Sequence, residues 1–169
     1  MEPKIILNTT RFSVSEQEYI LNTGTKKTKY IVHHPGAVVV IPKISSDKFI
    51  LIKQERKAIN KVIIEFPAGC IDPGEDPLVC ADRELQEEIG FKAAELIPIG
   101  ISYPAPGFCD EKQFFYIGKN LLPSKLPADE GEEIEMFEAT ANEIDTMIQD
   151  GSIIDGKTIA IWMKYKLLK

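Results

Sequence analysis

Cysteine, histidine and tryptophan are scarce in this chain of 169 residues, which has three cysteines, two histidines and one tryptophan. The cysteines form no CxxC pair (Cys70, Cys80 and Cys109). The histidines are adjacent (His33 and His34) and fit no spacing of a zinc site. The sequence therefore argues against a zinc centre. A bound metal is expected to have oxygen ligands, which favours Mg²⁺ or Mn²⁺.

Long apolar runs and positive charge are also lacking. No apolar run approaches the length of a membrane span, and no secretory signal follows Met1. With free thiols, this predicts a cytoplasmic protein. The 20 Lys and Arg residues face 26 Asp and Glu residues, so the formal net charge is −6. Because a phosphate backbone calls for a basic face, nucleic acid is not an expected main partner. The charge is compatible with an anionic small molecule held by a few local cations or a metal.

The order of the expected elements predicts a mixed α/β sandwich. Residues 1–35 alternate polar and β-branched residues around a turn at 22–24, which predicts antiparallel strands that form either an appendage or a dimerisation element. Residues 36–169 form the expected main domain. Its predicted strands lie at 37–42, 48–55, 61–67, 95–103, 111–119 and 134–139. Helices are expected after Thr140, which opens a capping box with Glu143, and after Asp155.

A further helix is predicted in the middle of the chain. Asp76 is a suitable N-cap, Pro77 suits the first helical position, and Gly90 suits the C-terminal end. At about 100° per residue, one apolar stripe is expected to face the sheet. Its members are Leu78, Ala81, Leu85 and Ile89.

Three glutamates, Glu84, Glu87 and Glu88, fall on a neighbouring arc of the same helix. Like charges at these spacings destabilise a helix by a few tenths of a kcal/mol. A solvated helix face would be the simplest interpretation of one such cluster. Divalent cations, however, would remove the repulsion, and Arg83 is placed to orient one carboxylate.

The spacing around these glutamates resembles the Nudix box. Gly69 is followed after five residues by Glu75, and after seven more by "RELQEEIGF" (83–91), which matches every defining position. The resemblance implies an α/β/α sandwich that hydrolyses a nucleoside diphosphate linked to another moiety. It also implies that Glu84 and Glu88 are the principal metal ligands, that Glu87 assists, and that the carbonyl of Ala68 completes the site.

Features outside the box resemble the ADP-ribose pyrophosphatase branch of that family. They are "EFPAG" (65–69), "KQER" (53–56), a proline at 106 and the acidic loop "DEGEEIE" (129–135). The resemblance implies that Arg56, Glu65 and Gly107 contact the substrate. Departing from the branch, "FCDE" replaces the usual small polar residues after Gly107. Arg11 and Phe12, in strands that match a dimerisation segment, are candidates for stacking on the adenine.

Two carboxylates compete for the role of general base. Glu132 aligns best with the catalytic glutamate of the mobile loop in that branch, and Glu111 is the competitor. Simpler interpretations remain for several residues: Glu132 as a surface charge, Arg56 as a surface cation, Glu65 as the partner of a lysine, and Phe12 as a packing residue.

The sequence thus predicts a homodimeric, Mg²⁺- or Mn²⁺-dependent enzyme that hydrolyses ADP-ribose to AMP and ribose 5-phosphate. One alternative keeps the chemistry and changes the substrate to another nucleotide-sugar such as GDP-mannose, or to a flavin or dinucleotide. A second alternative is a non-catalytic sensor of ADP-ribose. Sensors tend to lose glutamates of the box or to carry a DNA-binding domain, and this chain does neither.

Overall fold

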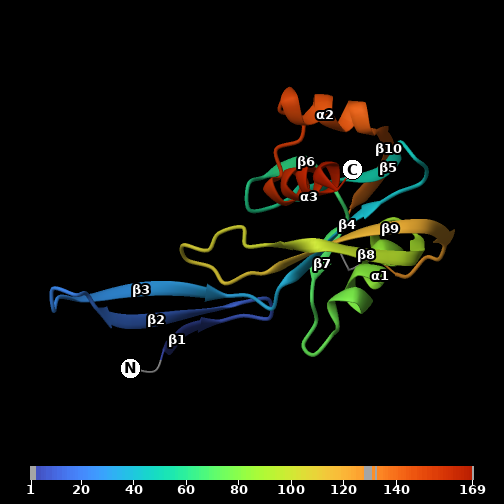
Figure 1. Cartoon of the computed structure of the whole chain (residues 1–169). Helices are drawn as coiled ribbons and strands as arrows, with labels where there is room; N and C mark the ends of the chain where they lie inside the picture. Colours follow the sequence, from blue (N-terminus) through green and yellow to red (C-terminus); the bar gives the residue numbers. More distant parts are fainter. Residues whose placement is uncertain (1–2, 128–130, 132, 169) are drawn as a thin grey trace.

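The N-terminal strands form a sheet of their own. The computed structural model describes residues 3–127, 131 and 133–168. Its first sheet is antiparallel, in the order β1 (Lys4–Asn8), β2 (Ser13–Ile20) and β3 (Lys26–His33). This sheet, here called the arm, extends away from the rest of the molecule (Figure 1). Its tip is the predicted turn, closed by a hydrogen bond from the Gly24 amide to the Leu21 carbonyl.

Two further sheets make up the main body. The larger has the order β7 (Ala68–Cys70), β4 (Ala37–Pro42), β9 (Gln113–Pro123) and β8 (Phe91–Ser102). It is mixed, because β4 runs parallel to β9 while the other neighbours are antiparallel. The smaller sheet is antiparallel, in the order β10 (Ile134–Thr140), β5 (Lys48–Arg56) and β6 (Lys61–Glu65).

Helices cover the larger sheet on both sides, as the predicted α/β/α sandwich requires (Figure 1). Helix α1 (Pro77–Glu88) packs on one face, while α2 (Ala141–Gln149) and α3 (Gly156–Leu167) lie on the other with the smaller sheet. Every residue of β4 is buried, so this strand separates two apolar clusters. No helix in the described part of the chain is both long and apolar enough to span a bilayer.

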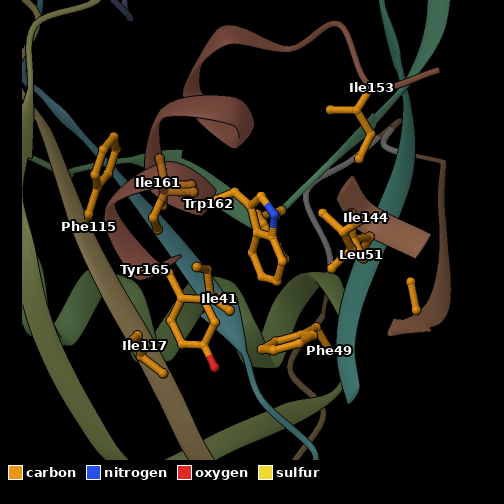
Figure 2. Packing of buried hydrophobic residues seen from close by; sticks show 13 residues of the cluster. Ile41, Phe49, Leu51, Phe115, Ile117, Ile144, Ile153, Ile161, Trp162 and Tyr165 are labelled. Carbon is orange, nitrogen blue, oxygen red and sulfur yellow. The ribbon is translucent and has the colours of Figure 1, made fainter. Parts of the chain in front are cut away.

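An aromatic cluster anchors α3. The Trp162 ring lies 5.0 Å from the Phe49 ring in an edge-on arrangement and 5.3 Å from the Tyr165 ring. Figure 2 shows these rings gathered with aliphatic side chains such as Ile41. The Trp162 indole nitrogen, which would otherwise be a buried unpaired donor, donates to Asp145 of α2 at 2.8 Å. The anchoring matters for the site because α3 begins beside it.

The expected elements are present, with differences in their bounds and in one buried face; β9, for example, covers 113–123 rather than 111–119. Strand β7 was not predicted separately, because three residues are too few for a periodic pattern. Strand β8 begins at Phe91, directly after α1, rather than at 95. The predicted apolar stripe is wrong at Leu78, which is 45% exposed, because the buried face is rotated toward the row that begins at the fully buried Cys80. That row continues at Glu84 and Glu88.

Candidate active site

Helix α1 directs carboxylates inward. The Asp76 side chain accepts a hydrogen bond from the Leu78 amide at 2.8 Å, and Gly90 has the positive φ of +74° that commonly ends a helix. With both ends fixed, the helix buries Glu84 and Glu88 to 8% exposure each, beside the fully buried Leu85. Buried carboxylates are rarely tolerated without partners, so their partners define the site. Glu84, Glu87 and Glu88 are called the carboxylate wall below.

Arg83 neutralises part of this negative charge. Its guanidinium binds both oxygens of Glu75 at 2.9 Å, and the same group donates to Glu84 at 2.7 Å and to Glu87 at 2.8 Å. The paired hydrogen bonds that Arg83 donates to Glu75 lower the pKa of Glu75 to about 2, and the same hydrogen bonds raise the pKa of Arg83. The sequence predicted that Arg83 orients one carboxylate, whereas it binds three.

Strand β7 passes directly against the carboxylate wall. The Ala68 amide donates to Glu88 at 3.0 Å. At the next residue, a Cβ built on Gly69 would lie 2.0 Å from the carboxyl carbon of Glu84. No pair of non-bonded atoms tolerates that distance, so a larger residue at this position would have to displace the Glu84 carboxylate or the strand, and glycine leaves both in place.

Opposite charges gather around a second buried carboxylate. Glu65 is fully buried at the end of β6 and accepts two hydrogen bonds from Arg56, at 2.7 and 2.6 Å. Lys157, in the first turn of α3, also donates to Glu65 and lies 3.0 Å from Asp155. The hydrogen bonds to Glu65 raise the pKa of Arg56, although burial opposes the shift. Arg56 and Lys157 are called the cation pair below.

The carboxylate wall and the cation pair line one pocket. It has a volume of about 230 Å³. Its remaining lining residues are Arg11, His34, Ala37, Ala68, Gly69, Cys70, Glu111 and Gln113. A neighbouring pocket of about 410 Å³ shares Arg11, Glu84 and Glu87 and reaches the β1–β2 turn with Phe12. A bound molecule can therefore contact negative and positive side chains of the main body together with residues of the arm.

The donors of the carboxylate wall fit a hard divalent cation. Across residues 3–127, 131 and 133–168, no three His, Cys, Asp or Glu side chains are already arranged to hold a metal ion. Arg83 explains this, because it binds two of the three wall carboxylates. Glu84, Glu87, Glu88 and Ala68 nevertheless line one pocket, and the oxygen donors that they carry suit Mg²⁺ and Mn²⁺.

The pocket assembles most of the predicted site residues. Glu84, Glu87, Glu88 and Ala68 line it together with Arg56, Arg11 and Glu111. Phe12 lines the neighbouring pocket, and Glu65 lies behind the cation pair. Gly107 borders a separate pocket with Lys29 and Tyr103. Glu132 lies outside the described residues.

Sequence reasoning missed Lys157, His34 and Gln113. Lys157 follows the N-cap of a helix 92 residues after Glu65, and no local pattern signals that pairing. From the sequence, His34 is considered only as a zinc ligand, which its spacing argues against, and no pattern signals that it lines the pocket. Gln113 is nearly buried and donates to Glu111 at 3.0 Å, a contact that requires the register of β9.

Comparison with known proteins identifies the family. The family model described as the NUDIX domain matches residues 33–160. The chain belongs to the Nudix family. This confirms the resemblance inferred from the box.

Characterised relatives of this Nudix protein carry several functional names. An ADP-ribose pyrophosphatase of Bacillus subtilis (strain 168) is 37% identical over 151 residues, which cover 88% of this chain and 81% of that protein. A methanol dehydrogenase activator of Bacillus methanolicus is 38% identical over 141 residues, covering 82% and 76%. A GDP-mannose pyrophosphatase of Escherichia coli O1:K1 / APEC is 28% identical over 173 residues, covering 92% and 88%.

A solved structure supports the fold. The crystal structure of an ADP compounds hydrolase superposes with a TM-score of 0.85 at 22% identity, covering 99% of this chain and 94% of that one. The α/β/α sandwich and the N-terminal strands are both included in that coverage. The predicted fold class is confirmed.

Proposed function

We propose that this protein hydrolyses ADP-ribose to AMP and ribose 5-phosphate with the help of Mg²⁺ or Mn²⁺. The observation that carries the proposal is the pocket in which the carboxylate wall and the cation pair meet. The 37% identical relative named ADP-ribose pyrophosphatase supports the choice of substrate. More broadly, hydrolysis of nucleotide-sugars or ADP compounds agrees with the names of several relatives and of the structural neighbour.

The carboxylate wall is assigned to the cation. Glu84 and Glu88 would be its principal ligands, Glu87 would assist, and Ala68 would contribute its backbone carbonyl. A bound divalent cation neutralises the charge of a diphosphate and activates water. For these carboxylates to take part, Arg83 has to give up its hydrogen bonds to Glu84 and Glu87, and its bidentate pairing with Glu75 retains it nearby.

The cation pair is assigned to the substrate. Arg56 and Lys157 project from the side of Glu65 into the same pocket, where they can bind phosphate or ribose oxygens. Glu65 supports both cations and fixes their positions. Arg11 and Phe12, which line the two neighbouring pockets, are proposed to contact the nucleobase, and Gly107 remains a predicted contact. Positioning and charge neutralisation would account for most of the rate acceleration.

The general base is assigned to Glu132, with Glu111 as the alternative. Glu111 lines the pocket, and Gln113 holds its carboxylate. We expect Glu132→Gln to lower kcat much more than Glu111→Gln at saturating Mg²⁺. A harmless Glu132→Gln substitution would transfer the role to Glu111.

The remaining features of the proposal concern the assembly and setting. We propose that residues 1–35 mediate a homodimer, that residues 36–169 are the catalytic domain, and that the protein works in the cytoplasm on a small molecule rather than on nucleic acid. Size-exclusion chromatography with light scattering tests the dimer, which should be lost on deletion of residues 1–35.

The decisive experiment is a product assay over a panel of ADP-ribose, GDP-mannose, NADH and FAD with Mg²⁺ or Mn²⁺. We expect AMP and ribose 5-phosphate in equal amounts from ADP-ribose, at the highest kcat/KM of the panel. Cleavage of GDP-mannose but not of ADP-ribose would make GDP-mannose the substrate. GDP-mannose is the next candidate because the 28% identical relative is named GDP-mannose pyrophosphatase. Tight binding of ADP-ribose without any product would favour the sensor.

A further inference from the structure

A chain of three side chains connects the arm to the main body. The Oγ atom of Ser15 in β2 lies 2.8 Å from Nε2 of His33 in β3. The Nδ1 atom of the same ring lies 2.6 Å from Oδ2 of Asp110. Because an ionised carboxylate can only accept, Nδ1 carries the proton and donates to Asp110. In the neutral ring, Nε2 then accepts from the Ser15 hydroxyl.

This arrangement resembles the serine, histidine and aspartate of a hydrolytic triad, but it cannot act as one. The nucleophile of a triad has to reach a substrate carbonyl. Ser15 is fully buried, and no substrate atom can approach its Oγ. The role of the three side chains has to come from the segments that they join.

Backbone hydrogen bonds reinforce the same junction. The Val32 amide donates to the Phe108 carbonyl at 2.8 Å, and the Asp110 amide donates to the Val32 carbonyl at 3.0 Å. The His34 amide donates to the other oxygen of Asp110 at 2.8 Å. The end of β3 thus pairs with residues 108–110, and the His33 ring extends the connection past β3 to β2.

The two joined segments contribute opposite sides of the proposed active site. The turn before β2 carries Arg11, which lines both pockets. Ser13, two residues after Arg11, is the cross-strand neighbour of His33. On the other side, Glu111 follows Asp110 directly and lines the same pocket. Movement at His33 would therefore change the spacing between Arg11 and the main body.

We propose that His33 is a positioning residue that fixes the arm relative to the loop of residues 103–112 and so sets the affinity of the pocket for its substrate. The part of the proposal that concerns affinity rests on the proposed function. Glu111 is held in place by contacts that do not involve His33. Gln113 donates to its carboxylate, and the Ala37 amide donates to the carbonyl of the next residue, Lys112. Loss of His33 should therefore displace Arg11 more than Glu111, and change KM more than kcat.

Kinetics of matched variants test the effect on the substrate. We expect His33→Ala to raise KM about 5- to 10-fold, the range for the loss of about one hydrogen bond, and to change kcat less than about threefold. His33→Asn keeps a donor for Asp110 and Ser15→Ala keeps the ring, so both should lie between His33→Ala and the wild type. Thr28→Ala, on an exposed part of β3, is the control and should match the wild type.

Two results would overturn the proposal. If His33→Ala lowers kcat while KM stays unchanged, the substitution merely reduces the active fraction. The second result comes from hydrogen–deuterium exchange of the whole protein, which requires no activity. We expect about tenfold faster exchange for His34 and Asp110 amides in His33→Ala, with the β4 amides unchanged; equal exchange would show that His33 does not hold the arm. If no sugar nucleotide is hydrolysed, the proposed function fails, while exchange still decides the coupling.

Discussion

The ion pairs around α1 and those around Glu65 differ in net charge. Glu65, Asp155, Arg56 and Lys157 are called the balanced cluster below. Around α1, one cation, Arg83, faces three carboxylates of Glu75, Glu84 and Glu87, which leaves a formal charge of −2 before Glu88 is counted. Around Glu65, two cations face two carboxylates, which leaves none. The first cluster lacks positive charge and the second is balanced.

This difference separates a site that needs a ligand from one that is complete by itself. Carboxylates gathered on one helix face repel one another, and a bound cation relieves that repulsion, so the wall favours a metal ion. The balanced cluster needs no further ion to be stable, and it holds its arginine and lysine in fixed positions for the proposed substrate. A change to the wall is expected to impair function alone, whereas a change to the balanced cluster is expected to reduce stability as well.

The largest effect should follow loss of a wall carboxylate. Glu84→Gln and Glu88→Gln keep the size of the side chain and remove one negative charge. Loss of a group that only orients a metal ligand typically lowers metal affinity or activity about 10- to 100-fold. Loss of a proposed metal ligand itself should therefore lower kcat/KM for ADP-ribose by about 100-fold or more. The helix should remain folded, since the repulsion within it decreases.

Glu95→Gln, on exposed β8, is the matched control and should retain full activity. Circular dichroism should show equal helix content in all three variants. Near-normal turnover by Glu88→Gln would rule out its assignment as a principal ligand.

A methyl group at Gly69 should have the next largest effect. In Gly69→Ala the new Cβ would meet the Glu84 carboxylate at 2.0 Å, so the strand or the glutamate has to shift. We expect kcat/KM to fall about tenfold or more, because small displacements of a positioned group are costly. Gly156→Ala adds the same methyl group where nothing lies within 4 Å, and should leave the rate unchanged. Equal rates for both variants would contradict the tight packing of β7 against α1.

Breaking the balanced cluster should reduce stability. Arg56→Met removes one of the two cations that face the fully buried Glu65 and should lower the free energy of unfolding by about 3 kcal/mol. Lys48→Met breaks an ion pair with Glu138 whose side chains are both 55% exposed, and should cost about 0–1 kcal/mol. Urea unfolding of the two variants measures the contrast, and similar losses would argue against a special role for Glu65.

The smallest effect concerns acid stability. Glu75 has a pKa of about 2, below its ordinary value of 4.5, because Arg83 donates to its carboxylate. A carboxyl group whose pKa is depressed in the folded state stabilises that state fully at pH values above its pKa in the unfolded chain. This contribution is lost as the pH falls through its pKa in the folded state. Glu75→Gln should therefore be less stable than the wild type at pH 7, and the difference should shrink between pH 4.5 and 2. A difference independent of pH would point to packing instead.

The contrast between the two clusters also explains what could be predicted from the sequence. The wall lies within five residues of one helix, where period and caps define a face, so its clustering is visible in the sequence alone. Glu65 and Lys157 are 92 residues apart, and their contact depends on how α3 docks against the sheets. Leu78 shows the limit within the helix itself, because periodicity gives relative angles and tertiary packing decides which angle is buried.

Helix α3 makes completion of the pocket depend on closure of the core. The same helix supplies Trp162 to the core and Lys157 to the pocket, and both residues lie far beyond the Nudix box in the chain. The pocket therefore gains its second cation only when α3 docks, in the same step that closes the core. A nascent chain made only as far as the Nudix box should remain inactive, because the helix that completes both parts has not yet been synthesised.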